Sequence, residues 1–125
     1  MAILTFTPLE VHLQNGSREC ICIGRAPGDE NEIHYWDPKV SRRHCQIVKC
    51  VDGSVRLFDE GSANGTYLNG VRIRHSILGV SIAPGDEITL RSPRKPHHLI
   101  LINSIRISQP NEPRVAFEQI VNRSF

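Results

Sequence analysis

The sequence predicts an all-β fold, an antiparallel sandwich or barrel of short strands, from three observations. Short apolar or alternating runs recur along the chain, as expected of half-buried strands. Asn-Gly or Asp-Gly dipeptides separate several of these runs and supply the positive φ angles of tight hairpin turns. No segment of helical length with helical spacing occurs through residue 108. Strands that follow one another without helices favour a sandwich or a barrel over a βαβ fold.

Three dipeptides, Asn15-Gly16, Asp52-Gly53 and Asn69-Gly70, mark the predicted hairpin turns. Apolar or alternating residues flank each of them, so the strands on either side can pair. The predicted strands are residues 2–6, 11–13, 19–23, 33–35, 45–51, 55–58, 66–68, 71–73, 87–90 and 99–107.

The C-terminal extension, residues 109–125, differs from the domain predicted over residues 1–108. Pro110 and Pro113 interrupt the strand pattern. Beyond them apolar side chains recur at helical spacing, at Phe117, Ile120, Val121 and Phe125. Two interpretations of this extension stay open: a short amphipathic helix docked on the sandwich, or a partly ordered tail.

Composition and charge exclude several classes of function. The 125 residues suit a single domain, and a net charge of +2 is too weak to indicate direct nucleic-acid binding. The longest apolar run, Leu99–Ile102, is far shorter than the ~18 residues of a membrane span. The N-terminal segment lacks the basic region of a signal peptide. We therefore expect an intracellular protein without membrane insertion, in either the nucleus or the cytoplasm.

The four cysteines, Cys20, Cys22, Cys45 and Cys50, indicate neither a metal site nor a disulfide. We predict no bound metal, because the sequence has no C-x-x-C knuckle and no H-x-x-x-H partner. All four lie in apolar, β-branched segments, where a free cysteine behaves as a small hydrophobic side chain. An intracellular location also disfavours a disulfide.

Three segments between predicted strands combine small, hydroxyl and cationic residues. They are Gly24-Arg25, Ser41–His44 and Asp59–Thr66. Arg25 and Arg42 offer forked guanidinium groups that match a phosphate. Ser41 offers a hydroxyl donor, and Asn64 offers both an amide donor and a carbonyl acceptor. This set of groups suits the recognition of an oxyanion better than its chemical conversion.

These segments hold no activated nucleophile with a convincing base. His44 and Cys45 are neighbours on a predicted strand, so their side chains point to opposite faces and His44 cannot readily activate the thiol. An acid pair among Asp37, Asp59 and Glu60 is the other enzymatic alternative. No Gly-rich loop opens a helix to hold a nucleotide. We therefore predict no catalytic residues, no cofactor and no enzymatic activity.

Four short motifs follow one another along the chain: Gly24-Arg25, Ser41-x-x-His44, Ser62-x-Asn64-Gly65-Thr66-x-Leu68-Asn69-Gly70, and Gly85-Asp86-Glu87-Ile88. In order and spacing they resemble the signature of the forkhead-associated (FHA) domain family over residues 20–103. The resemblance implies an FHA-type β-sandwich of about eleven mostly antiparallel strands. It also implies binding of phosphothreonine peptides on loops at one end of the sandwich.

The resemblance also implies roles for single residues. Arg25, Ser41 and Arg42 are expected to bind the phosphate, and Asn64 the peptide backbone. Lys39 is expected to favour an acidic side chain three residues C-terminal to the phosphothreonine. Ala63 departs from the family pattern, because many members have a Ser or Thr hydroxyl there. The residues expected to structure the loops are Gly24, His44, Ser62 and Gly65. Apart from the resemblance, Trp36, near the end of a predicted strand, is interpreted as a packing residue rather than a stacking platform.

The predicted partner is a phosphothreonine-containing protein, which implies an upstream Ser/Thr kinase. An alternative use of the same fold is a phosphate-independent structural or dimerisation scaffold. The missing hydroxyl at Ala63 and the C-terminal extension keep this alternative open. The sequence does not decide the oligomeric state, and self-association stays open.

Overall fold

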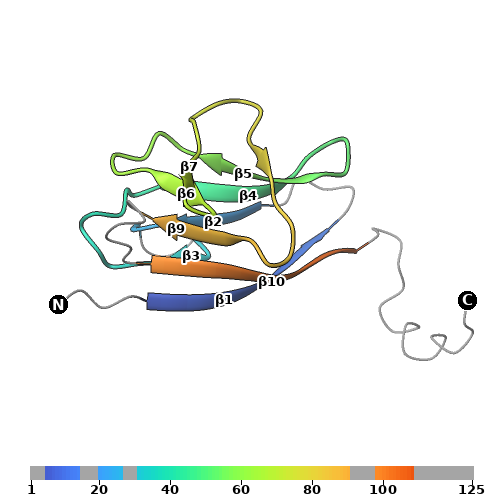
Figure 1. The fold of residues 1–125 in the computed structure, drawn as a ribbon, viewed down its shortest axis with the longest axis horizontal. Helices are drawn as coiled ribbons and strands as arrows, with labels where there is room; N and C mark the ends of the chain where they lie inside the picture. Colours follow the sequence, from blue (N-terminus) through green and yellow to red (C-terminus); the bar gives the residue numbers. More distant parts are fainter. Residues whose placement is uncertain (1–4, 15–19, 27–30, 91–97, 109–125) are drawn as a thin grey trace, which may run out of the picture.

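The computed structural model describes residues 5–14, 20–26, 31–90 and 98–108. These residues form ten strands in two five-stranded sheets that pack face to face (Figure 1). The strand order is β1-β10-β9-β6-β7 in one sheet and β3-β2-β4-β5-β8 in the other. The predicted all-β sandwich is confirmed. The strands are β1 (Thr5–Gln14), β2 (Cys20–Gly24), β3 (Ile33–His34), β4 (Cys45–Lys49), β5 (Val55–Asp59), β6 (Thr66–Leu68), β7 (Val71–Arg72), β8 (Val80–Ser81), β9 (Glu87–Leu90) and β10 (His98–Ser108).

The core lies between the two sheets and consists of apolar side chains from alternate strand positions. In β9, for example, Ile88 and Leu90 are both completely buried, because every second side chain of a strand points to the same face. Burial of each such side chain contributes about 1.5–3 kcal/mol, so the core fixes the sheets from which the loops project. The most deeply buried side chains are Val11, Leu13, Ile23, Val40, Ile47, Leu57, Ile88, Leu90, Ile100 and Ile102.

Two of the three predicted hairpin turns lie in the described residues, and their geometries differ. Asn69 and Gly70 both have positive φ, at 51° and 86°, as a two-residue hairpin turn requires. At the other turn only Gly53 has positive φ, at 90°, and the Cys50 amide donates to the Ser54 carbonyl. The predicted strand 45–51 therefore ends earlier, at Lys49, because residues 51–53 form the loop. The Asn15-Gly16 turn lies outside the described residues.

β1 departs most from the sequence prediction. One strand replaces the two predicted over residues 2–6 and 11–13, and it pairs in parallel with β10. Pro8 lies within it, which is compatible with a strand at the edge of the sheet. The two-residue strand β8 is too short to show an alternating pattern, so the sequence does not reveal it.

β10 ends at Ser108, the last described residue. Residues 109–125, and the short helix interpreted there, therefore lie outside the described residues. Within the described ranges, no helix has the length and apolar character that crossing a membrane requires.

Candidate functional site

Three loops that are distant in the sequence meet at one end of the sandwich, at the left in Figure 1. The first follows β2, the second precedes β4, and the third joins β5 to β6. Hydrogen bonds connect the second loop to each of the others. All of the predicted site residues lie on these loops except Gly24, which ends β2.

The first loop is fixed to the second through Arg25. The Arg25 amide donates to the Ser41 carbonyl at 3.0 Å, and its side-chain Nε donates to the Val40 carbonyl at 2.9 Å. Nε2 of His34 donates to the Arg25 carbonyl at 2.9 Å. Because Nε is held by the protein, the two terminal guanidinium nitrogens are the part of Arg25 that can meet an anion.

Gly24 permits the close approach of these two loops. A Cβ added to Gly24 would lie 2.2 Å from the carbonyl oxygen of Arg42, which is backbone and cannot easily move aside. Asn31, only 6% exposed, completes the junction. Its Nδ2 donates to the carbonyls of Ala26 and Arg42, both at 2.9 Å. Sequence analysis does not identify Asn31, since a single asparagine in a loop carries no pattern.

The second loop is fixed to the third through Ser41 and Asn64. The Ala63 amide donates to Oγ of Ser41 at 3.0 Å, and Nδ2 of Asn64 donates to the Lys39 carbonyl at 2.8 Å. Since Ser41 Oγ accepts here, its own proton is the one it can donate to a ligand. Asn64 likewise keeps Oδ1 as an acceptor. The Ala63 amide already donates to Ser41, so it does not simply replace the hydroxyl that alanine lacks.

The imidazole of His44 is completely buried and joins the same two loops from beneath. Nδ1 accepts from the Ser41 amide at 3.1 Å, and Nε2 donates to the Gly65 carbonyl at 2.8 Å. The partners define the tautomer, because an amide N–H only donates and a carbonyl only accepts. Burial lowers the pKa of His44, against the opposing influence of the Gly65 carbonyl and Asp59. The ring is therefore neutral and holds the two loops together through hydrogen bonds.

The carboxylate of Asp59, 5% exposed, organises the third loop. It accepts hydrogen bonds from the amides of Gly61 (3.0 Å) and Ser62 (3.1 Å) and from the hydroxyls of Ser62 (2.6 Å) and Thr66 (2.7 Å). Ser62 Oγ in turn accepts from the Gly65 amide. Burial favours a higher pKa, but these hydrogen bonds hold the pKa of Asp59 below its ordinary value. The run of small and hydroxyl residues after Asp59 is the sequence signal for this role.

Asp37 and His98 support the second loop from across the sandwich. Nε2 of His98, on β10, lies 2.9 Å from Oδ2 of Asp37, and the Tyr35 ring stacks on the His98 ring at a centroid distance of 4.2 Å. Oδ1 of Asp37 accepts from the Lys39 amide. The sequence does not reveal this cluster, because its members are 61 residues apart.

The side chains exposed around the site include Lys39, Arg42 and Trp36. Lys39 and Arg42 are exposed on the second loop, and the Arg42 carbonyl accepts from the Ala26 amide at 3.2 Å. Trp36 is 76% exposed, so its interpretation as a packing residue is wrong. β3 ends at His34, and the Trp36 ring meets the His34 ring edge-on instead of entering the core.

The arrangement suits anion binding rather than covalent chemistry. Arg25, Ser41 and Asn64 belong to one hydrogen-bonded network, with Arg42 exposed on the same loop as Ser41. Burial raises the pKa of the Cys45 thiol, which is only 1% exposed, and leaves it protonated. Among the described residues, no group of three or more His, Cys, Asp or Glu side chains is placed to hold a metal ion.

A model of the FHA domain matches residues 21–91, more than half of the chain. The chain belongs to the FHA family. The matched segment contains all three loops and the strands from which they project. FHA domains typically bind phosphothreonine, and this domain is not an enzyme. The family inferred from the four motifs is thus confirmed.

The FHA domain is also similar to individual proteins. It is 39% identical over 67 residues to the oxoglutarate dehydrogenase inhibitor of Corynebacterium diphtheriae, a match that covers 54% of this chain and 42% of that protein. An engineered FHA with a Myc-pTBD peptide has 35% identity and a TM-score of 0.52, over 61% of this chain and 58% of that one. Full-length yeast Pml1p has 29% identity and a TM-score of 0.54, over 62% of this chain and 58% of that one.

Proposed function

We propose that the FHA domain binds phosphothreonine peptides, with Arg25, Ser41 and Arg42 on the phosphate and Asn64 on the peptide backbone. The observation that carries the proposal is the network that joins Arg25, Ser41 and Asn64 across three loops. A network that orders these side chains before the ligand arrives reduces the entropy cost of binding. Membership of the FHA family supports the same conclusion.

The phosphate is bound by charge and by directed donors. Arg25 contributes two terminal guanidinium nitrogens in a forked geometry, Ser41 contributes its hydroxyl proton, and Arg42 contributes a second positive charge. Threonine is preferred to serine if its methyl group is buried, and one buried methyl contributes about 0.8 kcal/mol, or about fourfold in affinity.

Asn64 and Lys39 set the path of the peptide. Asn64 donates to the Lys39 carbonyl through Nδ2, which leaves Oδ1 as an acceptor for a peptide amide. Lys39 is exposed and lies in a turn that Asp37 fixes by accepting from its amide, which supports its proposed contact with an acidic side chain three residues C-terminal to the phosphothreonine. Gly24, His44, Ser62 and Gly65 act beneath these residues by holding the loops in place.

We infer that the domain acts on its partner by binding, and that this partner is phosphorylated on threonine by a Ser/Thr kinase. The relative from C. diphtheriae, named as an inhibitor of another enzyme, supports action through binding. That relative is bacterial, which favours the cytoplasm over the nucleus. All four cysteines are free thiols, as in an intracellular protein.

The test is a titration of a phosphothreonine peptide and its unphosphorylated twin, with aspartate or alanine three residues C-terminal to the threonine. Wild type should bind the phosphorylated peptide at least tenfold more tightly. Arg25→Ala should remove about 1.5–3 kcal/mol of binding, or about ten- to 100-fold in Kd. Lys39→Gln should abolish only the preference for aspartate.

Arg106→Ala is the matched control for the loss of positive charge, because Arg106 is exposed on β10 outside the three loops. It should bind like wild type. Equal binding of both peptides by wild type, with no effect of Arg25→Ala, would instead favour a phosphate-independent scaffold.

A further inference from the structure

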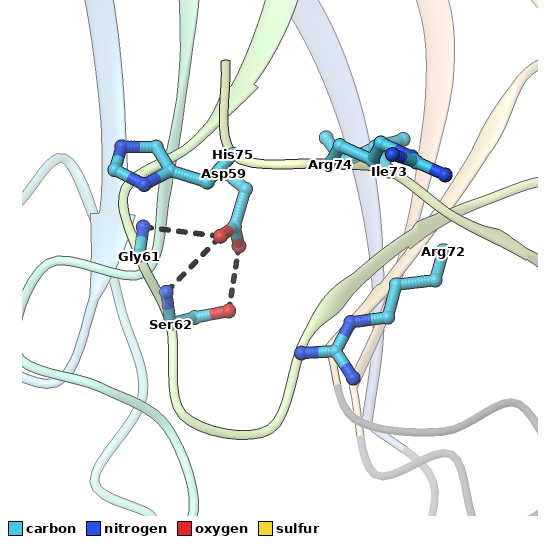
Figure 2. A pocket seen from close by; sticks show the side chains of 7 residues that line it. All are labelled: Asp59, Gly61, Ser62, Arg72, Ile73, Arg74 and His75. Carbon is cyan, nitrogen blue, oxygen red and sulfur yellow. Dashed lines mark hydrogen bonds between the residues drawn. The ribbon is translucent and has the colours of Figure 1, made fainter.

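The third loop of the FHA domain also forms one wall of a separate pocket. The pocket has a volume of about 500 Å³ and lies between Asp59–Ser62 on one side and residues 72–75 on the other (Figure 2). None of the residues assigned above to the phosphate or to the peptide backbone lines it. Because the same loop carries Ala63 and Asn64, however, the pocket directly adjoins the proposed phosphothreonine site.

In the segment of residues 72–74, two arginine side chains lie on the side opposite the core. Ile73 is only 7% exposed, and its amide donates to the Thr66 carbonyl, which fixes the segment against β6. In an extended segment alternate residues face opposite sides, so Arg72 and Arg74 lie on the exposed side of Ile73. In Figure 2 the Arg72 side chain extends toward the loop that carries Ser62.

Two glycines of the loop allow cationic or ionisable side chains to lie against its backbone. Gly65 has φ of +96°, and a Cβ on it would lie 2.8 Å from Nε of Arg72. Gly61 has φ of +77°, and a Cβ on it would lie 3.7 Å from the ring of His75. A side chain at Gly65 would collide with Arg72, and the positive φ disfavours a side chain at either position, so glycine lets Arg72 and His75 lie against the loop.

The cations of this pocket lack a counter-anion within the part of the chain that the structure describes. No hydrogen bond or ion pair joins the guanidinium group of Arg72 or Arg74 to any described residue. The one acidic residue of the pocket, Asp59, already accepts four hydrogen bonds from its own loop. The Arg72 guanidinium beside the hollow favours an oxyanion there, since it can donate two parallel hydrogen bonds to it, and Arg74 adds a second positive charge at the edge of the pocket.

We propose that this pocket binds a second anionic group, a phosphate or a carboxylate, of the same peptide whose phosphothreonine binds at Arg25 and Ser41. The proposal rests on the proposed function. Arg72 lies against Gly65, so consecutive Cα spacings of about 3.8 Å place its guanidinium within about 12 Å of Ala63, a span of about three to four extended peptide residues.

The experiment is a calorimetric titration with a set of phosphothreonine peptides. A second position, scanned from two to six residues on either side, carries phosphothreonine, glutamate or glutamine. Wild type should bind the best doubly phosphorylated peptide at least about tenfold more tightly than its glutamine counterpart. Glutamate should give a smaller increase, which separates a carboxylate source from a phosphate source.

The double variant Arg72→Gln/Arg74→Gln should lose this increase and still distinguish phosphothreonine from threonine. Arg72→Lys should retain part of it, since lysine keeps the charge but not the fork. Arg106→Gln, which removes an exposed charge on β10, should retain all of it. Thermal unfolding of each variant establishes that it is folded.

Two results would overturn the proposal, and they differ from failure of the proposed function. One is a second anion that adds no affinity at any position in wild type. The other is an increase that the double variant retains in full. If wild type does not distinguish phosphothreonine from threonine at all, the proposed function fails, and the second subsite fails with it.

Discussion

Gly24 shows at the scale of one residue why the motif needs glycine. Its φ is not in the left-handed region, so backbone freedom is not the reason. The reason is space, because a Cβ would lie 2.2 Å from the Arg42 carbonyl oxygen and 2.9 Å from Oδ1 of Asn31. Gly53 differs, with φ of +90° and no heavy atom within 4 Å of the position that a Cβ would take. A substitution at Gly24 therefore tests crowding, and a substitution at Gly53 tests backbone strain.

We expect Gly24→Ala to weaken both the fold and the site. Displacing the Arg42 carbonyl should lower the free energy of unfolding by about 1–3 kcal/mol. That carbonyl belongs to Arg42, and its displacement should also move Arg42 and Ser41, which are proposed to bind the phosphate. Affinity for a phosphothreonine peptide should therefore fall about tenfold, or about 1.4 kcal/mol. Chemical denaturation and peptide titration measure the two effects.

Gly53→Ala is the matched control for Gly24→Ala. It should cost about 1–2 kcal/mol of stability through its positive φ, and leave peptide affinity within about twofold of wild type. Unchanged peptide affinity in Gly24→Ala would contradict the role given to the close approach.

At the scale of the element, the loop between β5 and β6 is held by one carboxylate. Asp59 ends β5 and accepts from donors that extend as far as Thr66 at the start of β6. The loop therefore begins and ends at the same side chain, and Ala63 and Asn64 project from a closed ring of hydrogen bonds. The hydrogen bond from Ala63 to Ser41 and the side of the Arg72 pocket that this loop forms both depend on that ring.

We expect Asp59→Asn to open this loop. Each carboxylate oxygen accepts two hydrogen bonds, so the amide NH2 of asparagine must face either the Gly61 and Ser62 amides, which cannot accept, or the two hydroxyls, which would have to reverse their hydrogen bonds. The free energy of unfolding should fall by about 3 kcal/mol, whereas Thr66→Val, which removes a single donor, should cost about 1 kcal/mol. Equal losses in the two variants, measured by denaturant unfolding, would argue against Asp59 as the centre of the loop.

The lowered pKa of Asp59 predicts that the stability of the domain changes with pH in acid. Its contribution to stability should be complete above the ordinary pKa of 3.8 and be lost as the pH falls below that value toward the folded-state pKa. Below pH 3.8 the Tm of wild type should therefore fall more steeply than that of Asp59→Asn.

At the scale of the whole molecule, His44 connects the two sheets at the binding end. It directly precedes β4 in one sheet, and it donates to Gly65, which directly precedes β6 in the other. Burial makes the ring neutral, and a protonated ring would lose Nδ1 as the acceptor for the Ser41 amide. The hydrogen bond from Ser41 to His44 is therefore sensitive to pH, whereas Nε2 can donate to Gly65 in either protonation state.

We expect the stability of the domain to decline as the pH falls below 6.5. The pKa of His44 is lower in the folded state than the ordinary value of 6.5, so the unfolded chain binds a proton that the folded domain does not. The resulting slope approaches, at most, about 1.4 kcal/mol per pH unit. His44→Gln cannot titrate and should lack this component in denaturant unfolding from pH 7.5 to 5. Parallel pH curves for wild type and variant would rule out His44 as its source.

The sequence by itself determined the fold class, the family and the residues of the candidate site. Alternating strands and glycine turns are local features, so an all-β sandwich could be predicted without tertiary contacts. Arg25, Ser41 and Asn64 could be selected because their guanidinium, hydroxyl and amide groups suit an oxyanion and because they lie in motifs whose order and spacing resemble the FHA signature. Asn69-Gly70 needed only its own two residues to specify its turn.

Only the tertiary structure decided how these residues are supported and what lies beside them. Asn31, Asp37 and His98 act through partners that are close in space and distant in the sequence. The parallel pairing of β1 with β10 joins the two ends of the domain, and no local pattern specifies such a pair. The Arg72 pocket likewise exists because β7 brings Arg72 back against Gly65. The spacing of apolar residues in the sequence indicates whether a segment is a strand or a helix, whereas packing decides which segments lie next to each other.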